Sequence, residues 1–298
     1  MSMRIAVIGK TGQLARALLH EGEALGHEII ALDRDALDLT SPAKEIEATI
    51  AELPSGLDAL IIAAAFTDVD GAENDPDLAY AVNATAPAII ARTCAKLDIP
   101  LIHISTDYVF DGEADFPYIP DDDTDPLGVY GASKFDGELA VLESGARALI
   151  LRTSWVYDGD GPNFLTTMLE IAERGDPISV VDDQIGRPTF SRHLALAILK
   201  AADVFSQEPD IETSIHHITN GGEPVSWAGF AKAIFKAKGL TKKVEDIPTS
   251  DYPTAAERPA YSVLDIDSFE RTFQHPLPDW QAGLRAALEM TDSIDSSD

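Results

Sequence analysis

Short apolar runs alternate with amphipathic stretches through the first half of the chain. The apolar runs predict strands at Arg4–Ile8, Glu28–Leu32, Ala59–Ala63, Leu101–Ile104 and Ala148–Arg152. The stretches between them predict helices near Gln13–Leu25, Ala43–Ala51, Pro76–Leu97 and Tyr130–Leu142. Near-continuous apolar strands are typical of a parallel sheet that helices cover on both faces. The pattern therefore predicts an α/β fold with a doubly wound parallel sheet.

The regular alternation of predicted strands and helices ends after Arg152, where prolines separate shorter elements. Helices are predicted near Asn163–Arg174, Ser191–Phe205, Ser226–Lys238 and Trp280–Glu289, and strands at Ile178–Val181 and Val244–Ile247. A strand at His216–Thr219 is expected to return to the main sheet. We therefore predict a dinucleotide-binding domain over residues 1–152, with a return near 191–220, and a smaller α/β substrate lobe over 153–190 and 221–290. The Ser- and Asp-rich residues 291–298 predict a disordered tail.

The composition is strongly acidic, with 51 Asp and Glu against 22 Lys and Arg and a formal net charge of −29. So negative a surface repels nucleic acid and anionic membranes, and we expect neither as a partner. The acidic residues form no focused patch in the sequence, and a solvated coat of the kind found in salt-adapted proteins is favoured. The run Asp121–Asp125 lacks the Gly and the final Glu of a calcium loop and predicts an exposed loop.

A single cysteine, Cys94, allows no intramolecular disulfide and suits a reducing cytoplasm. The N-terminus carries no signal-peptide pattern. No apolar run approaches the ~18 residues that a membrane span needs. We therefore expect a soluble cytoplasmic protein.

A glycine turn follows the first predicted strand, with the sequence Gly9-Lys10-Thr11-Gly12-Gln13-Leu14-Ala15. Glycines permit the tight turn and the close approach of a pyrophosphate, which the N-terminus of the next helix stabilises. Ala15 is small enough for the helix to pack closely on the strand. The motif indicates dinucleotide binding in a Rossmann-like domain, and it lacks the Lys-Ser/Thr ending of a P-loop.

Further candidates for cofactor binding follow the second and third strands. Asp33 is placed to take the ribose hydroxyls of NAD, whereas Arg34 is placed to pair with the 2′-phosphate of NADP. The two indicate opposite preferences, so NADPH and NADH both stay open. Asp38 and Leu39 are placed to cover the adenine. The small residues Ala63, Ala64 and Ala65 let a cofactor lie close to the backbone or simply pack in the core.

A Thr and a Tyr/Lys pair carry the candidate chemistry. Thr106 and Asp107 end the fourth strand, at the edge where doubly wound sheets bind ligands. Tyr130 and Lys134 share one face of a predicted helix at i, i+4 spacing. An ammonium and a cationic nicotinamide lower the pKa of a phenol from its usual value near ~10. The pattern predicts that Tyr130 protonates a carbonyl oxygen, which Thr106 orients, as hydride arrives.

Several longer strings carry a family resemblance. They are residues 9–14, 63–70 with Ala72-Glu73, 105–112, Tyr130-Gly131-x-x-Lys134, Arg152-Thr153-Ser154-Trp155-Val156-Tyr157, Asn163-Phe164, Asp183-Gln184-x-Gly186-x-Pro188-Thr189 and Arg258-Pro259. From about Arg4 to Leu288 the chain resembles the dTDP-4-dehydrorhamnose reductases of the extended short-chain dehydrogenase/reductase superfamily. The resemblance implies reduction of the C4 carbonyl of dTDP-4-dehydro-6-deoxy-L-mannose to dTDP-L-rhamnose by NADPH, with NADH also possible.

The resemblance also implies roles for individual residues. Tyr130 would be the proton donor, Lys134 its partner and a ribose ligand, and Thr106 the residue that stabilises the carbonyl. Cofactor contacts would come from Gly9, Gly12, Gln13, Leu14, Asp33, Arg34, Asp38, Leu39, Ala63–Ala65, Tyr130 and Lys134. Thr106, Asp107 and Trp155 would meet the sugar. Gln184, Arg187 and Arg258 are candidates for the nucleotide diphosphate, although an ordinary surface ion pair explains each arginine equally well.

Two departures from the family pattern bear on the substrate lobe and on assembly. Tyr261 stands where family members usually carry Asn shortly after the Arg-Pro pair. Some members are metal-bridged dimers that use Glu side chains, and the apparent counterparts are Ala17 and Arg192. Neither side chain is a carboxylate, so we predict no metal. A monomer and a homodimer both stay open.

Three other functions compete with this interpretation. A sugar-nucleotide 4,6-dehydratase needs an Asp-Glu pair after the strand-end Thr, whereas Asp107 is followed by Tyr108. A 4-epimerase or another reductase of the same fold can use the Tyr/Lys pair alone. A non-catalytic NADP-binding regulatory subunit would not require Thr106, Tyr130 and Lys134 together.

Overall fold

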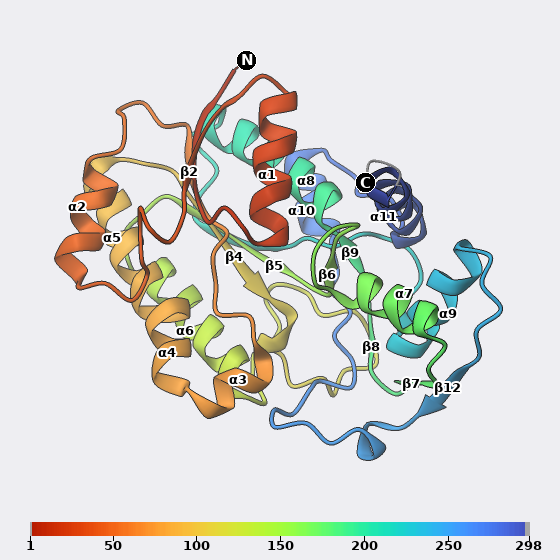
Figure 1. Ribbon diagram of the computed structural model, residues 1–298. Coiled ribbons are helices and arrows are strands. Elements are labelled where there is room, and N and C mark those ends of the chain that lie inside the picture. Colours follow the sequence, from red (N-terminus) through yellow and green to blue (C-terminus); the bar gives the residue numbers. More distant parts are fainter. Residues whose placement is uncertain (1, 296–298) are drawn as a thin grey trace.

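The computed structural model describes residues 2–295 and has a central parallel sheet between two layers of helices (Figure 1). The strands are β1 (Arg4–Ile8), β2 (Glu28–Leu32), β3 (Ala59–Ile62), β4 (Leu101–Thr106), β5 (Ala148–Thr153) and β10 (Ser214–His217). They lie in the order β10-β5-β4-β3-β1-β2, and all neighbours pair in parallel. The predicted doubly wound sheet is confirmed. Its strand order reverses between β1 and β3, which is where such sheets bind ligands.

Alternation along the buried strands builds a core on each face of the sheet. Ile5 and Val7 of β1 pack in the cluster that includes α1 (Gln13–Ala24) and α8 (Ser191–Gln207). Ala6 and Ile8 face the opposite cluster, with α2 (Ala43–Ala51) and α5 (Ala86–Leu97). α6 (Val129–Leu142) packs against β4 and α5 on this second side. Successive side chains of a strand point to opposite faces, so strands buried on both sides are apolar throughout.

The later half of the chain builds a third apolar cluster. It contains side chains from α7 (Phe164–Arg174), α9 (Trp227–Ala237) and α11 (Trp280–Asp295). Three two-stranded ladders accompany these helices: β6 (Val156–Tyr157) with β9 (Thr189–Phe190), β7 (Ile178–Val181) with β12 (Val244–Ile247), and β8 (Ile185–Gly186) with β11 (Val225–Ser226). Because β6 follows β5 directly, this cluster begins at the carboxyl edge of the main sheet (Figure 1).

Several elements differ from the sequence prediction. The helix expected over Pro76–Leu97 is α4 (Pro76–Tyr80), a π-helical turn (Ala81–Thr85) and α5, and α3 (Val69–Asn74) precedes it. The aspartates Asp68 and Asp75 cap α3 and α4 by accepting the backbone N–H groups of Gly71 and Leu78, a signal that the apolar pattern does not contain. The 3₁₀ turn Thr249–Asp251 and helix α10 (Asp267–Phe273) were also not predicted.

Two boundaries in the second half also move. The strand expected at His216–Thr219 is β10, which begins two residues earlier and pairs with β5. α11 continues to Asp295, so residues 291–295 are helical and the predicted disordered tail is wrong there. The apolar face of this helix packs in the third cluster through Leu284 and Leu288, which supports its length. Residues 296–298 lie outside the described residues.

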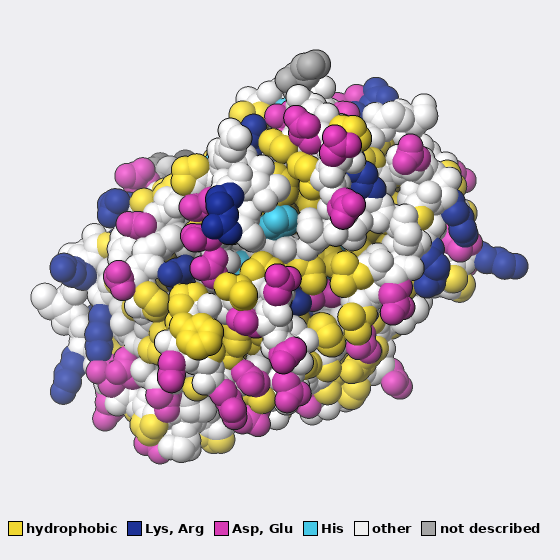
Figure 2. All heavy atoms as spheres, turned by 180° about the vertical axis from the view of Figure 1, so that it is seen from behind, with side chains coloured by type: hydrophobic (Ala, Val, Ile, Leu, Met, Phe, Trp, Pro, Cys, Tyr) yellow, Lys and Arg dark blue, Asp and Glu magenta, His cyan; other side chains and the backbone are white. Residues whose placement is uncertain are grey.

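Acidic side chains are spread over the face of the molecule drawn in Figure 2. Lys and Arg side chains lie among them. Among residues 2–295, no helix combines the length and apolar character needed to cross a membrane.

Candidate active site

A cleft of about 1160 Å³ opens along the carboxyl ends of β1, β3, β4 and β5. The predicted residues that line it are Gly9, Gly12, Gln13, Leu14, Asp33, Arg34, Asp38, Leu39, Ala63, Ala64, Ala65, Thr106, Asp107, Tyr130, Lys134 and Trp155. Residues that are widely separated in the sequence therefore line the same cleft.

The glycine turn forms one end of the cleft. Gly9 has φ +118°, and a Cβ there would come within 3.3 Å of both the Ala64 nitrogen and the Ala15 Cβ. A Cβ on Gly12 would meet nothing within 4 Å and would project into open space. α1 begins after Gly12 without a side-chain cap, so its first N–H groups are left for a ligand. This arrangement fits an anionic pyrophosphate.

Two cation–carboxylate pairs stand beside the turn. Lys10 Nζ lies 3.3 Å from Asp33 Oδ2, and Arg34 Nε lies 3.3 Å from Asp38 Oδ2. The backbone N–H of Ala36 and the Lys10 ammonium lower the pKa of Asp33, which stays ionised. All four side chains are at least one-third exposed, so both pairs are weak and free to rearrange.

Tyr130 and Lys134 lie one turn apart on α6. Gly131 lets this helix approach the 3₁₀ turn Asp107–Val109 after β4 closely, because a Cβ there would stand 2.1 Å from the Tyr108 carbonyl oxygen. The buried Lys134 ammonium donates to the Ile104 carbonyl at 2.6 Å, and burial lowers the pKa of Lys134 to about 8. Burial raises the pKa of Tyr130 to about 12, although its interaction with the Thr106 hydroxyl lowers it. In the protein alone the phenol is therefore protonated at neutral pH. The lowered pKa expected from the sequence refers to the complex with a cationic nicotinamide, and it stays a prediction.

The end of β4 supplies the groups that face Tyr130. The Thr106 hydroxyl donates to Asp107 Oδ1 at 3.0 Å and accepts the Tyr108 N–H at 3.2 Å. Burial raises the pKa of Asp107 to about 7, and hydrogen bonds from Ser262 and Thr106 partly offset this shift. Tyr108 meets Tyr130 edge to face, with ring centroids 5.6 Å apart. Tyr108 thus occupies the position where a dehydratase would need Glu.

An aromatic pair forms the opposite wall of the cleft. Trp155 and Trp227 stack with ring centroids 3.6 Å apart and planes inclined by 6°. Trp155 adopts φ +47°, a left-handed conformation that is strained for a bulky residue. Gly186 makes room for the ring, because a Cβ there would lie 2.5 Å from Trp155 Cε2. Strain of this kind is concentrated at functional sites.

Three predicted substrate residues do not line the cleft. Gln184 donates to the Thr249 hydroxyl at 3.1 Å, and Arg187 donates to the Leu264 carbonyl at 3.0 Å. Arg258 forms a bidentate pair with Asp70, at 2.6 and 3.2 Å. The structure thus gives each of them a partner within the chain.

Sequence reasoning missed several residues of the site. Trp227 was predicted only as part of a helix. Asn83, buried in the π-helical turn, bonds both the N–H and the carbonyl of Phe66, which lines the cleft. A polar residue inside a strongly apolar helical stretch was the available signal. Ser105 and Thr153, like the predicted Gln13, each hold a buried side-chain oxygen with no partner among residues 2–295, as expected where a ligand binds.

The part of the chain that the structure describes has no group of three or more His, Cys, Asp or Glu side chains that could hold a metal. Ala17 is buried against the sheet, and Arg192 lies 3.7 Å from Glu21.

Comparison with known proteins identifies close relatives. The family model described as the RmlD substrate binding domain matches residues 3–293. The dTDP-4-dehydrorhamnose reductase of Sinorhizobium fredii is 41% identical over 289 residues, which cover 95% of this chain and 96% of that protein. The Escherichia coli enzyme of the same name is 38% identical, with 96% and 97% coverage. The crystal structure of the Bacillus anthracis dTDP-4-dehydrorhamnose reductase in complex with NADP has a TM-score of 0.90 and 33% identity, covering 98% of this chain and 100% of that one.

Proposed function

The chain belongs to the family of dTDP-4-dehydrorhamnose reductases, and on this premise we infer that it reduces the C4 carbonyl of dTDP-4-dehydro-6-deoxy-L-mannose to dTDP-L-rhamnose with NADPH. The observation that carries this conclusion is the convergence of Thr106, Tyr130 and Lys134 on the cleft that the glycine turn closes.

We propose that Tyr130 is the general acid. Its raised pKa keeps the phenol protonated, so it holds the proton that the C4 oxygen takes up. Thr106 donates a second hydrogen bond to the same oxygen, which requires its hydroxyl to turn away from Asp107 Oδ1. Lys134 stabilises the phenolate that remains and binds the cofactor ribose, which requires its ammonium to leave the Ile104 carbonyl or to share it.

The residues of the glycine turn fit the cofactor. Gly9, Gly12, Gln13 and Leu14 would hold the pyrophosphate at the N-terminus of α1, and Ala63–Ala65 would lie along the dinucleotide. Asp38 and Leu39 would cover the adenine, and Asp33 and Arg34 would face its ribose. When bound, the nicotinamide supplies the hydride.

The aromatic wall of the cleft is the proposed site of the sugar. We propose that Asp107 and Trp155 contact the sugar, and that Trp227 supports Trp155 by stacking on it. Gln184, Arg187 and Arg258 stay proposed contacts of the nucleotide diphosphate, and each would give up a partner within the chain on binding. The third apolar cluster and its helices would form the sugar-nucleotide lobe. The single cysteine supports a cytoplasmic location.

A direct assay tests the proposed function. We expect the purified protein to oxidise NADPH in the presence of dTDP-4-dehydro-6-deoxy-L-mannose, measured by the loss of nicotinamide absorbance. A panel of other nucleotide 4-ketosugars is the comparison, because an enzyme for a different sugar would prefer one of them. Tight NADPH binding without turnover on any of these sugars would favour the regulatory alternative.

Arg34 is expected to determine the cofactor preference. In the proposed complex its guanidinium moves from Asp38 to the 2′-phosphate, which NADH lacks. Because the side chain is 80% exposed, we expect Arg34→Ala to raise KM for NADPH by about tenfold, which corresponds to about 1.4 kcal/mol. KM for NADH serves as the internal control and should stay within about twofold. An equal rise for both cofactors would exclude 2′-phosphate recognition by Arg34.

A further inference from the structure

The 158–163 loop joins β6 to α7 at the dinucleotide end of the cleft. Pro162 of this loop and Arg16 of α1 both line the cleft. Arg16 lies one turn after Gln13, so it belongs to the helix whose N-terminus fits the pyrophosphate. The loop follows the strand that leaves the aromatic wall at Trp155. It is therefore placed between the cofactor helix and the elements of the third cluster.

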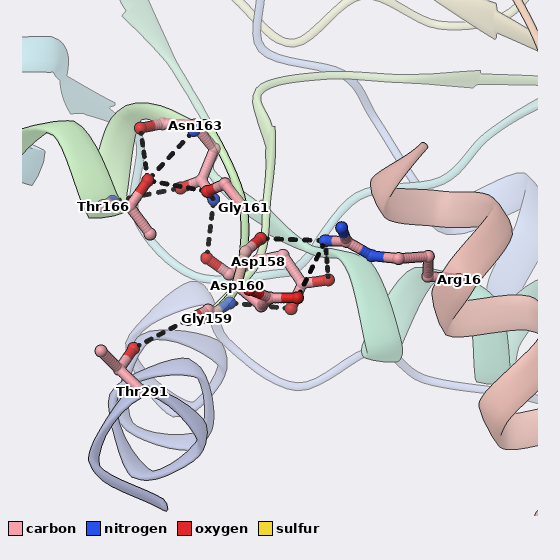
Figure 3. Close-up of polar contacts among 8 residues, drawn as sticks. All are labelled: Arg16, Asp158, Gly159, Asp160, Gly161, Asn163, Thr166 and Thr291. Atoms are coloured by element: carbon pink, nitrogen blue, oxygen red, sulfur yellow. Dashed lines mark hydrogen bonds and ion pairs between the residues drawn. The ribbon is translucent and has the colours of Figure 1, made fainter. Parts of the chain in front are cut away.

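Side chains from three helices bind four consecutive carbonyl groups of the 158–163 loop (Figure 3). Arg16 Nη2 of α1 donates to the Asp160 carbonyl at 2.9 Å. The Thr291 hydroxyl of α11 shares its single proton between the Gly159 carbonyl and the Ala287 carbonyl of its own helix, each at 3.1 Å. Asn163, which caps α7, donates to the carbonyls of Asp158 and Gly161, each at 2.9 Å, and Thr166 adds a second bond to Gly161. Side chains thus supply hydrogen bonds to the carbonyl groups of residues 158–161.

Ion pairs and close backbone contacts with Arg16 also hold the 158–163 loop. The buried Asp158 carboxylate accepts the Gly159 N–H at 2.7 Å, and the Arg16 guanidinium lies 3.8 Å from it and 3.6 Å from the Asp160 carboxylate. Gly161 has φ +72°, and a Cβ there would stand 3.2 Å from the Arg16 nitrogens. The guanidinium therefore lies directly against the loop backbone, and its carbonyl bond is the shortest of its contacts.

We propose that the 158–163 loop is a preset wall for the bound dinucleotide, and that Arg16 is the positioning residue that holds this wall against α1. The proposal rests on the proposed function, because it assumes that the dinucleotide occupies this end of the cleft. Ordering a loop when a ligand binds weakens affinity, whereas a loop that is already ordered avoids this cost. Loss of Arg16 should therefore weaken cofactor binding and leave the chemical step intact.

Cofactor titration of an Arg16→Ala variant tests the proposal. We expect Kd for NADPH to rise by about tenfold, the loss of one charge-assisted hydrogen bond in a partly exposed site. Since the contacts of Arg16 are with the loop and not with Thr106, Tyr130 or Lys134, kcat at saturating NADPH should stay within about twofold. Arg16→Lys should restore most of the affinity, because an ammonium donates to the same carbonyl.

A second variant removes a contact between the 158–163 loop and α11. Thr291→Val keeps the shape of the side chain and removes the bond to Gly159, so Kd for NADPH should rise roughly threefold. Arg174→Ala is the matched control, since Arg174 at the end of α7 pairs with the exposed Asp176 and does not line the cleft. If Arg16→Ala and Thr291→Val both bind NADPH as tightly as the unaltered protein, the proposed role of the 158–163 loop is refuted. The proposed function is unaffected by that result. No NADPH binding by the unaltered protein would overturn the proposed function itself.

Discussion

Replacing Tyr130 by Phe is expected to lower kcat by a factor of about 10² to 10⁴, the usual contribution of a positioned general acid. The variant removes only the phenolic oxygen and keeps the ring that meets Tyr108 edge to face. Because the proposed contacts with the dinucleotide come mainly from the glycine turn and the Asp33 region, Kd for NADPH should stay within about threefold.

Steady-state turnover and a fluorescence titration with NADPH check this expectation together. Tyr252→Phe is the matched control, because this tyrosine is 58% exposed and does not line the cleft. Unchanged turnover of the Tyr130→Phe variant would refute the assignment of the acid. A parallel loss of cofactor affinity would show that the phenol serves binding rather than proton transfer.

Replacing Arg152 by Met is expected to lower the free energy of unfolding by about 3–5 kcal/mol. Arg152 of β5 donates to both oxygens of Glu138 on α6, at 2.7 and 2.9 Å, and both side chains are at most 2% exposed. The single variant leaves the Glu138 carboxylate buried without its cation. The double variant Arg152→Met, Glu138→Leu replaces both charges by apolar groups and should recover most of the loss.

Urea denaturation of the unaltered protein and of these variants measures the effect. Arg174→Met, which removes an exposed ion pair, should change the free energy of unfolding by no more than about 1 kcal/mol. Equal stability of the single and double variants would refute the view that the unpaired carboxylate carries the cost.

The same pair bears on activity at high pH. Glu138 lies one turn beyond Lys134 and raises the pKa of that ammonium, against the larger effect of burial. Protonated Lys134 is lost as pH rises through about 8, so turnover should fall there. Without Glu138 the ammonium loses its proton at lower pH, and the alkaline limb of the pH–rate profile of the double variant should move in that direction. An unmoved limb would show that another group sets it.

The sheet and the centre of the site could be predicted because local rules determine both. The apolar strands specify a parallel sheet, whose carboxyl edge gathers the residues at the strand ends. Thr106 and Ala63–Ala65 line the cleft for this reason, and helical spacing places Tyr130 and Lys134 together. These placements depend on periodicity, which a single sequence contains.

The far wall of the site depends on long-range packing, which a single sequence does not contain. Trp227 reaches the cleft only because α9 packs beside Trp155, 72 positions away by sequence number. Arg258 was a reasonable cation for a diphosphate, yet the fold brings Asp70 to it and forms an ion pair. Asn83 of the π-helical turn likewise bonds Phe66, and this pairing becomes visible only in three dimensions.

The stacked indoles of Trp155 and Trp227 also limit how this protein can evolve. The Trp155 ring lies against Trp227 on one side and occupies the space that any side chain at Gly186 would need. A mutation that adds even a methyl group at position 186 must displace the ring, and it becomes tolerable only if position 155 changes as well. Among descendants of this chain, substitutions at positions 155, 186 and 227 should therefore be inherited as a set. A lineage that altered one of these positions alone would lose the shape of the aromatic wall before its substrate specificity could change to another sugar.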